Sequence, residues 1–184
     1  NEDATLRIPA GVTVDTGSDQ LDIDDVDRIR GAGTVRSEKK IDLAADSISL
    51  DDGRVDNTDG SLQLIVDSET SLTADGAVLA SANVMELRSN DAMSVDDADI
   101  DNTAGDKGLK LDSEAGLTAD GSTLTSAGKT EILSKDDMSV QSAVVDNSEG
   151  DNVDIFVESK SDLTVDSTVF NAADEITLKS GGEK

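Results

Sequence analysis

The pentapeptide Leu-Thr-Ala-Asp-Gly occurs twice in this chain, at positions 72–76 and 117–121, forty-five residues apart. A longer segment has the same spacing: ISLDDGRVDN at 48–57 returns in variant form at 93–102 and again at 138–147. The two series are variants of one template, so the underlying unit is about half of this period. A fixed internal period of this kind predicts equivalent structural units that stack on one another.

Within each unit, apolar and polar residues alternate over three short stretches. One copy shows this alternation at Leu109, Leu111, Leu117, Ala119 and Leu124. A period of two indicates β-strands, and no helical period of comparable length competes with it. A single unit cannot bury its apolar face, but units stacked about 4.8 Å apart can.

The predicted fold class is therefore all-β, a right-handed parallel β-helix (β-solenoid) of seven to eight rungs, each of about 21–24 residues. The predicted hand follows from the strong preference of parallel strand crossovers for right-handed connections. Residues 1–180 are expected to form a single solenoid domain, and residues 181–184 a C-terminal tail.

The chain has 41 acidic and 15 basic residues, which gives a formal net charge of -26. Such a charge repels nucleic acid and anionic membrane surfaces, so neither is an expected partner. No apolar run reaches membrane-spanning length, so direct membrane insertion is not expected either. Acidic residues spread along the whole chain suit a protein solvated in concentrated salt. A halophilic source is our hypothesis, and an acidic mesophilic surface protein is the alternative.

The chain contains neither histidine nor cysteine, which removes imidazole and thiolate as bases, nucleophiles and metal ligands. Serines that recur at one bend of the rung are therefore predicted to satisfy backbone groups rather than to catalyse. They are Ser68, Ser89, Ser113, Ser134 and Ser159. A second column is also predicted to be structural, with stacked amides that bond along it. Its members are Asn57, Ser81, Asn102, Ser126 and Asn147.

The outer face of the middle strand carries a hydroxyl column and, two residues further on, an acidic column. The first comprises Thr13, Ser49, Thr73, Ser94, Thr118, Ser139 and Thr164, and the second Asp15, Asp51, Asp75, Asp96, Asp120, Gln141 and Asp166. Like charges about 5 Å apart repel one another, so we expect concentrated salt or bound cations to offset the repulsion. An ice- or mineral-binding face is an alternative, although missing Thr-x-Thr pairs count against ice.

Three longer loops, DNTDG, DNTAGD and DNSEGD, concentrate hard oxygen ligands of the type that Ca²⁺ and Mg²⁺ prefer. The candidate metal ligands are Asp56, Asp101, Asp106, Asp146 and Asp151. The loops match neither the EF-hand nor the nonapeptide of calcium-binding solenoids, so polar turns without a metal are the alternative. We expect no other cofactor.

The only two aromatic residues, Phe156 and Phe170, fall in the last full rung. Phe170 is predicted to point inward, and Phe156 outward beside Leu133 of the preceding rung, where the C-terminal segment or another chain would cover it. Terminal rungs expose unpaired backbone groups that invite another chain to add, so end-to-end association is expected. The predicted assembly residues are Leu6, Ile8, Phe156, Phe170, Ile176 and Leu178.

The rhythm LxLxS, LTADGS and DN over residues 41–178 resembles the haemagglutinin-type repeats of bacterial filamentous adhesins. That resemblance implies a right-handed β-helix at a cell surface that attaches rather than catalyses. The chain is also similar to the bactofilins in size, in its scarcity of aromatics and in its terminal Phe170. Bactofilins imply an end-to-end cytoplasmic scaffold filament, although their rungs are usually shorter and richer in glycine at the turns.

The function expected from the sequence is a non-enzymatic structural solenoid, partnered by itself or by another structural protein. Its expected location is a cell surface, the extracellular space or a virion, and a cytoplasmic scaffold is the alternative. An enzyme that resembles the pectin-lyase-like β-helices and acts on polysaccharide is the further alternative. Such enzymes use carboxylates with Arg or Lys in a groove of long loops, whereas the loops here are short and Tyr and Trp are missing.

Overall fold

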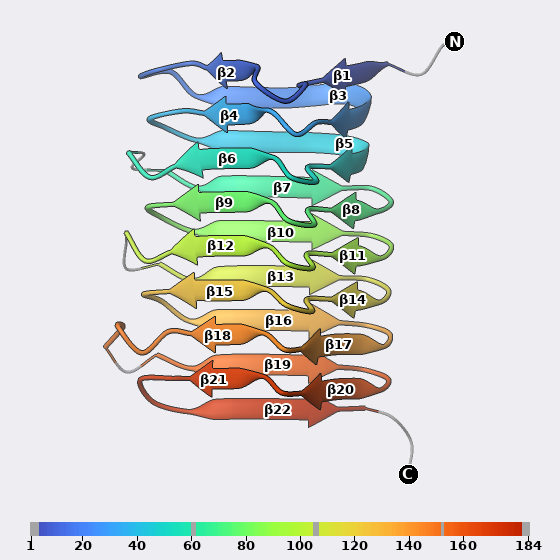
Figure 1. The fold of residues 1–184 in the computed structure, drawn as a ribbon, viewed down its shortest axis with the longest axis vertical. Helices are drawn as coiled ribbons and strands as arrows, with labels where there is room; N and C mark the ends of the chain where they lie inside the picture. Colours follow the sequence, from blue (N-terminus) through green and yellow to red (C-terminus); the bar gives the residue numbers. More distant parts are fainter. Residues whose placement is uncertain (1–3, 60–61, 105–106, 152, 182–184) are drawn as a thin grey trace.

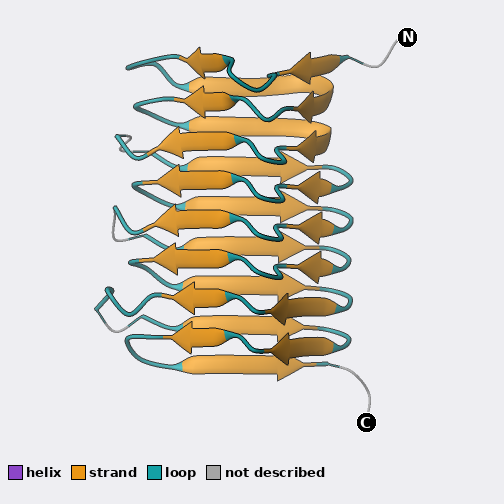
Figure 2. Cartoon of the chain, in the orientation of Figure 1, coloured by secondary structure: helices purple, strands orange, loops and turns teal. Residues whose placement is uncertain are grey.

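A computed structural model describes residues 4–59, 62–104, 107–151 and 153–181 of the chain. Its regular elements are all parallel strands, stacked turn upon turn along one axis (Figures 1 and 2). One sheet contains one strand from each turn and has eight strands, so the solenoid has about eight turns. In Figure 1 the chain runs left to right along the more distant face and returns along the nearer face as it descends. The coil is therefore right-handed, and the predicted fold class is confirmed.

Each turn has three strands, one on each of three faces of the stack. Two long strands, β3 (Leu21–Arg30) and β5 (Ile41–Ser49), bend from the first face onto the second. The first face otherwise contains β7 (Leu64–Ser68), β10 (Met85–Ser89), β13 (Leu109–Ser113), β16 (Thr130–Ser134), β19 (Ile155–Ser159) and β22 (Ile176–Ser180). The second face contains β1 (Thr5–Arg7), β8 (Leu72–Thr73), β11 (Met93–Ser94), β14 (Leu117–Thr118), β17 (Met138–Gln141) and β20 (Leu163–Asp166).

The third face forms a separate sheet. It contains β2 (Thr13–Asp15), β4 (Thr34–Arg36), β6 (Arg54–Asn57), β9 (Val78–Ser81), β12 (Asp99–Asn102), β15 (Thr123–Ser126), β18 (Val144–Asp146) and β21 (Val169–Asn171). Thr13 and Asp15 thus lie on this face, opposite Thr34 and Arg36, so their predicted place in the middle-strand columns is wrong. The segment VTVD copies the LTAD pattern, but β1 already occupies the second face of that turn.

Inward side chains form continuous apolar columns inside the stack. One column on the first face runs through Leu43, Val66, Leu87, Leu111, Ile132 and Val157, all completely buried. Each buried aliphatic side chain of this size stabilises the fold by about 1.5 to 3 kcal/mol. Because strand pairing places equivalent residues directly above one another, the repeat in the sequence becomes a column in space.

The turn between the second and third faces explains the repeated pentapeptide. Gly76 and Gly121 have φ of 64° and 70°, a region that glycine enters without strain. In alternate turns Asp52 and Asp97 adopt the same left-handed conformation, with φ of 56° and 54°. A Cβ atom on Gly76 would lie 2.8 Å from the Oδ1 atom of Asp52, and one on Gly121 would collide with Asp97. Aspartate and glycine therefore alternate at this turn from residue 52 to residue 121, whereas Ser142 and Ser167 occupy it in the next two turns with φ of 54°.

The serine column satisfies backbone carbonyls at the first corner, as predicted. Ser113 Oγ lies 2.8 Å from the carbonyl oxygen of Asp91 in the preceding turn and 3.0 Å from that of Gly116 in its own turn. The equivalent Ser68 and Ser159 make the same pair of contacts with their own neighbours. Each hydroxyl therefore joins two successive turns at the bend.

The asparagine column is buried, but its amides do not bond along the column. Asn57, Asn102 and Asn147 each donate from Nδ2 to a carbonyl of the long loop that follows them, and Asn147 also reaches Gly128 of the preceding turn at 3.4 Å. Serines alternate with these asparagines, so no two amides are neighbours, and the predicted amide ladder is wrong. Their Oδ1 atoms are buried without a hydrogen-bond partner. The asparagines therefore close the long loops, and Asn147 in addition bonds to the preceding turn.

Candidate assembly interface

The C-terminal end of the stack exposes apolar side chains that point along core columns. Ile176 and Leu178 are 42% and 45% exposed, whereas Ile155 and Val157, directly beneath them in the same columns, are completely buried. The outer edges of β20, β21 and β22 pair with no further strand among the described residues. Both sequence-predicted residues of this strand thus lie at an open edge (Figure 1).

The N-terminal end is better covered. Leu6 is half-buried and packs against the core, and Ile8 is only 3% exposed. The backbone of Ile8 passes so close to Gly31 that a Cβ on that glycine could not be accommodated, and a Cβ on Gly33 would lie 2.5 Å from Ile8 Cγ2. Of these two predicted assembly residues, Leu6 lies at the edge, while Ile8 is a core residue.

The two phenylalanines have different positions. Phe170 lies on β21 at the C-terminal edge, opposite Val145, and packs partly against the core as predicted. Phe156 lies outward on the side of the stack as predicted; its direct neighbour in the preceding turn is Glu131, and Leu133 is its diagonal neighbour. The ammonium groups of Lys129 and Lys179 lie 5.8 Å and 4.6 Å from its ring centroid. Such cation–π contacts suit a covered side face rather than an end.

Charge differs between the two ends. On the second face, the outward column holds Ser49 and then serine or threonine in every later turn, but Arg7 and Arg30 in the first two. Arg7 forms no ion pair with any residue that the structure describes. At the other end of this column, Asp162 and Asp166 flank Thr164. The N-terminal edge of the second face is therefore basic, and its C-terminal edge is acidic.

The acidic column of the second face is held by hydrogen bonds between turns. Asp96 Oδ1 accepts from the backbone N–H of Asp120 at 2.8 Å, and Asp120 Oδ1 accepts from that of Gln141 at 2.8 Å. Asp75 Oδ1 accepts from Asp96 N at 3.0 Å and from Ser94 Oγ at 2.6 Å. These donors tie each carboxylate to the next turn, and screening of the column by salt or cations stays a prediction.

The predicted metal ligands serve as turn acceptors where they are described. Asp101 Oδ1 accepts from the backbone and the hydroxyl of Thr103 at 2.9 and 2.7 Å, and Asp146 does the same with Ser148. Hydrogen bonds from Ser148 and Asn171 lower the pKa of Asp146. Burial opposes ionisation of Asp56, but hydrogen bonds from Thr58 and Arg54 outweigh it and lower its pKa.

Asp106 lies outside the described residues, and Asp151 is exposed in the loop after Asn147. Within the described part of the chain, no group of three or more acidic side chains is arranged to hold a metal ion. The calcium site therefore stays a prediction.

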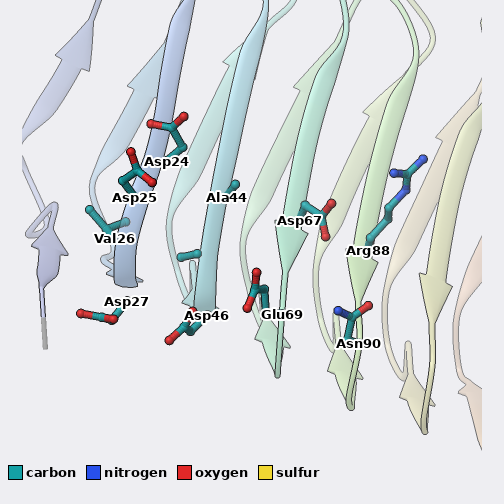
Figure 3. A pocket seen from close by; sticks show the side chains of 11 residues that line it. Asp24, Asp25, Val26, Asp27, Ala44, Asp46, Asp67, Glu69, Arg88 and Asn90 are labelled. Carbon is teal, nitrogen blue, oxygen red and sulfur yellow. The ribbon is translucent and has the colours of Figure 1, made fainter.

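A hollow of about 700 Å³ lies on the first face near the N-terminal end. The carboxylates that line it lie on or beside β3, β5 and β7, and the one cation of the lining, Arg88, lies on β10 (Figure 3). The Arg88 guanidinium already pairs with Glu86 at 2.7 Å. The lining residues include Asp24, Asp25, Asp27, Asp46, Asp67 and Glu69.

A second hollow, of about 500 Å³, follows the second face over β8, β11, β14 and β17. It is lined by the hydroxyl column and by small residues such as Ala92 and Gly116. The lining repeats from turn to turn, so it does not single out one binding position. The two ends are thus the regions that differ most from the repeating lattice.

Comparisons with protein-family models, with curated proteins and with solved structures gave no match for this chain. The described residues contain no helix of the length and hydrophobicity needed to cross a membrane.

Proposed function

We propose that this chain is a non-enzymatic structural β-solenoid that self-associates end to end. The observation that carries the proposal is the open C-terminal edge, where Ile176 and Leu178 continue core columns but are almost half exposed. Unpaired strand edges with apolar side chains are templates for another chain, and natural proteins usually block them. In this proposal the chain acts alone as a filament or as part of a cell-surface or virion fibre.

The terminal edge offers both components of a strand-addition contact. Backbone groups of β20, β21 and β22 are available for main-chain hydrogen bonds, and Val165, Val169, Ile176 and Leu178 supply exposed apolar area. Main-chain bonds give such a contact its affinity, and alternate side chains give it specificity. A second solenoid can supply a matching set of strands on all three faces.

The test is to compare Ile176→Arg with Thr177→Arg on the same strand. Residue 176 points along the core column, and residue 177 points outward beside Phe156. We expect Ile176→Arg to abolish concentration-dependent association in sedimentation velocity, because a buried unpaired charge is costly at the joint. Thr177→Arg is the matched control and should associate like the parent chain. Association that is unaffected by Ile176→Arg would refute assembly through this edge.

The proposal includes a high-salt environment, which the net charge of -26 supports. Salt screens repulsion among exposed carboxylates, so the midpoint of thermal unfolding should rise from low salt to molar KCl. The experiment compares KCl with an equal concentration of a neutral osmolyte, which separates screening from general stabilisation. A midpoint that does not change with KCl would favour the mesophilic alternative.

Two alternatives remain as proposals. A bactofilin-like cytoplasmic scaffold uses the same end-to-end contact and differs only in location, which localisation of the tagged chain in cells would decide. A polysaccharide-acting enzyme would draw on the hollow near Arg88, where carboxylates and an arginine occur together. The ion pair between Arg88 and Glu86 supports a structural use of that arginine. Release of reducing sugar that is lost in Arg88→Ala would favour the enzyme.

A further inference from the structure

Thr130 places a polar side chain in an inward column of the first face whose other described members are apolar. Strand pairing stacks Thr130 directly between Leu109 and Ile155, and its side chain is completely buried. The apolar members of the column are Leu21, Ile41, Leu64, Met85, Leu109, Ile155 and Ile176. A hydroxyl that is taken out of water without a hydrogen-bond partner costs free energy. Packing alone therefore does not explain Thr130.

The Thr130 hydroxyl is buried and has no hydrogen-bond partner among the described residues. The carbonyl oxygen of Asp154 in the next turn accepts from the backbone N–H of Thr130 at 3.0 Å. The same oxygen accepts from Asn147 Nδ2 at 2.8 Å. A backbone carbonyl oxygen has two lone pairs, so these two donors already use its capacity. The hydroxyl proton therefore needs a different acceptor.

Asn147 brings a second unpaired oxygen to the same place. Its side chain is 1% exposed, and its Oδ1 atom is buried without a partner in the part of the chain that the structure describes. Because Asn147 Nδ2 and Thr130 N donate to one carbonyl oxygen, the two residues lie against the same peptide group. An amide oxygen only accepts, whereas a hydroxyl both donates and accepts. A direct hydrogen bond would satisfy both atoms, but the two side chains do not form one.

We propose that this corner of the stack binds one buried water molecule, which accepts from the Thr130 hydroxyl and donates to Asn147 Oδ1. The carbonyl oxygen of Gly128 is the third partner, because its bond from Asn147 Nδ2 is long, at 3.4 Å, and leaves a lone pair for the second proton of the water. Buried waters typically make about three hydrogen bonds to polar groups that are otherwise unsatisfied. The threonine side chain also has fewer atoms than those of Leu109 and Ile155 beside it, which leaves more room in the column.

The equivalent corner two turns earlier shows what Thr130 adds. There Asn102 Nδ2 donates to the carbonyl oxygens of Lys107 and Gly108 at 2.9 and 3.0 Å. The second of these oxygens also accepts from Met85 N at 3.2 Å, so Met85 takes the place of Thr130. Asn102 Oδ1 is likewise unpaired, but methionine has no hydroxyl to donate to a water. The water site is therefore expected at the corner of Thr130 and not at that of Met85.

The proposed water links two successive turns. Thr130 is the first residue of β16, whereas Asn147 follows β18 and holds the loop that leads to β19. The water therefore ties this loop to the turn beneath it, in addition to the hydrogen bond from Asn147 to Gly128. The site lies inside the stack, so it does not depend on how chains associate.

Crystallography of the parent chain tests the ligand. We expect high-resolution crystals grown in NaCl to show one ordered molecule within hydrogen-bond distance of both Thr130 Oγ1 and Asn147 Oδ1. Crystals soaked in RbCl separate water from a monovalent cation, because rubidium scatters anomalously. An anomalous peak at this position would overturn water in favour of a cation. A direct hydrogen bond between the two side chains, with no molecule between them, would overturn the site itself.

Magnetic relaxation dispersion of ¹⁷O-labelled water gives a readout in solution, since it counts water molecules that stay bound for longer than the protein takes to tumble. Thr130→Val keeps the shape of the side chain and suits an apolar column, but it removes the hydroxyl. We expect this variant to lose one long-lived water relative to the parent chain. Thr130→Ser keeps the hydroxyl, is the matched control and should retain that water. Equal counts for the parent chain and Thr130→Val would overturn the role of the hydroxyl.

Discussion

The interior and the terminal turns of this solenoid share one sequence template but differ sharply in burial. Val157 and Leu178 occupy the same inward column on adjacent strands, yet Val157 is completely buried and Leu178 is 45% exposed. In a stack of parallel strands, a side chain packs against the turn before it and the turn after it. Leu178 has only the first of these neighbours among the described residues.

This difference shows that burial depends on position along the stack rather than on residue type. The stability of a repeat array is approximately a sum over units and over the interfaces between neighbours. A terminal turn has one interface instead of two, so it should open first. A second solenoid docked at that end would convert a terminal turn into an interior one.

The largest expected effect comes from shortening a leucine of one inward column, once in an interior turn and once in the terminal turn. Leu87→Ala removes a completely buried side chain from an interior turn and should destabilise the fold by about 2 to 5 kcal/mol. Leu178→Ala is the same change in the same column at the terminal turn and should cost less than about 1 kcal/mol, since the leucine is half exposed there. Urea unfolding of dilute, monomeric protein measures both.

Raising the protein concentration sharpens this comparison. If ends associate, Leu178 becomes buried at the joint, so the cost of Leu178→Ala should grow with concentration while that of Leu87→Ala stays constant. Similar costs for the two variants in dilute solution would mean that the terminal turn is not frayed, contrary to the exposure of Leu178.

Much of the fold could be predicted because the repeat records local packing. The alternation at Leu109 and Leu111 specified strand β13, and the serine column specified a bend that the hydroxyls do satisfy. Features that depend on another turn were harder to predict. The clash between Asp52 and a Cβ at residue 76 requires knowing which turn lies above which.

The same limit applies to the candidate site. Ile176 and Leu178 could be assigned to an end because they belong to the last repeat. Ile8 looked equivalent, but the close approach of Gly31 and Gly33 buries it, and nothing in the local pattern records that approach. Phe156 points outward as predicted, and because Ser159 pairs with Ser134, its direct neighbour is Glu131 and Leu133 is its diagonal neighbour.

A smaller effect is expected in the column that closes the long loops. Asn102→Ala removes the donor to the carbonyl oxygens of Lys107 and Gly108 and should cost about 1 to 3 kcal/mol, because buried acceptors are left unsatisfied. Thr103→Ala alters the same loop at a less buried position and should cost less. At the terminal turn this column ends in Ala172, which makes no such contact. Urea unfolding of the two variants measures the free energy that each loses. A larger loss for Thr103→Ala would contradict the role of Asn102 in closing the loop.

The smallest expected effect concerns the acidic column of the second face, compared between an interior turn and the terminal turn. Asp120 accepts hydrogen bonds from Gln141 N and Ser139 Oγ of the next turn, both at 2.8 Å. Asp166 ends the same column and accepts only from the adjacent Ser167 Oγ, at 3.3 Å, among the described residues. Both alanine variants remove one negative charge, so the relief of repulsion is similar and the difference isolates the hydrogen bonds between turns. We expect Asp120→Ala to cost about 1 kcal/mol more than Asp166→Ala in urea unfolding at fixed salt. Equal costs would mean that screening, rather than these donors, stabilises the column.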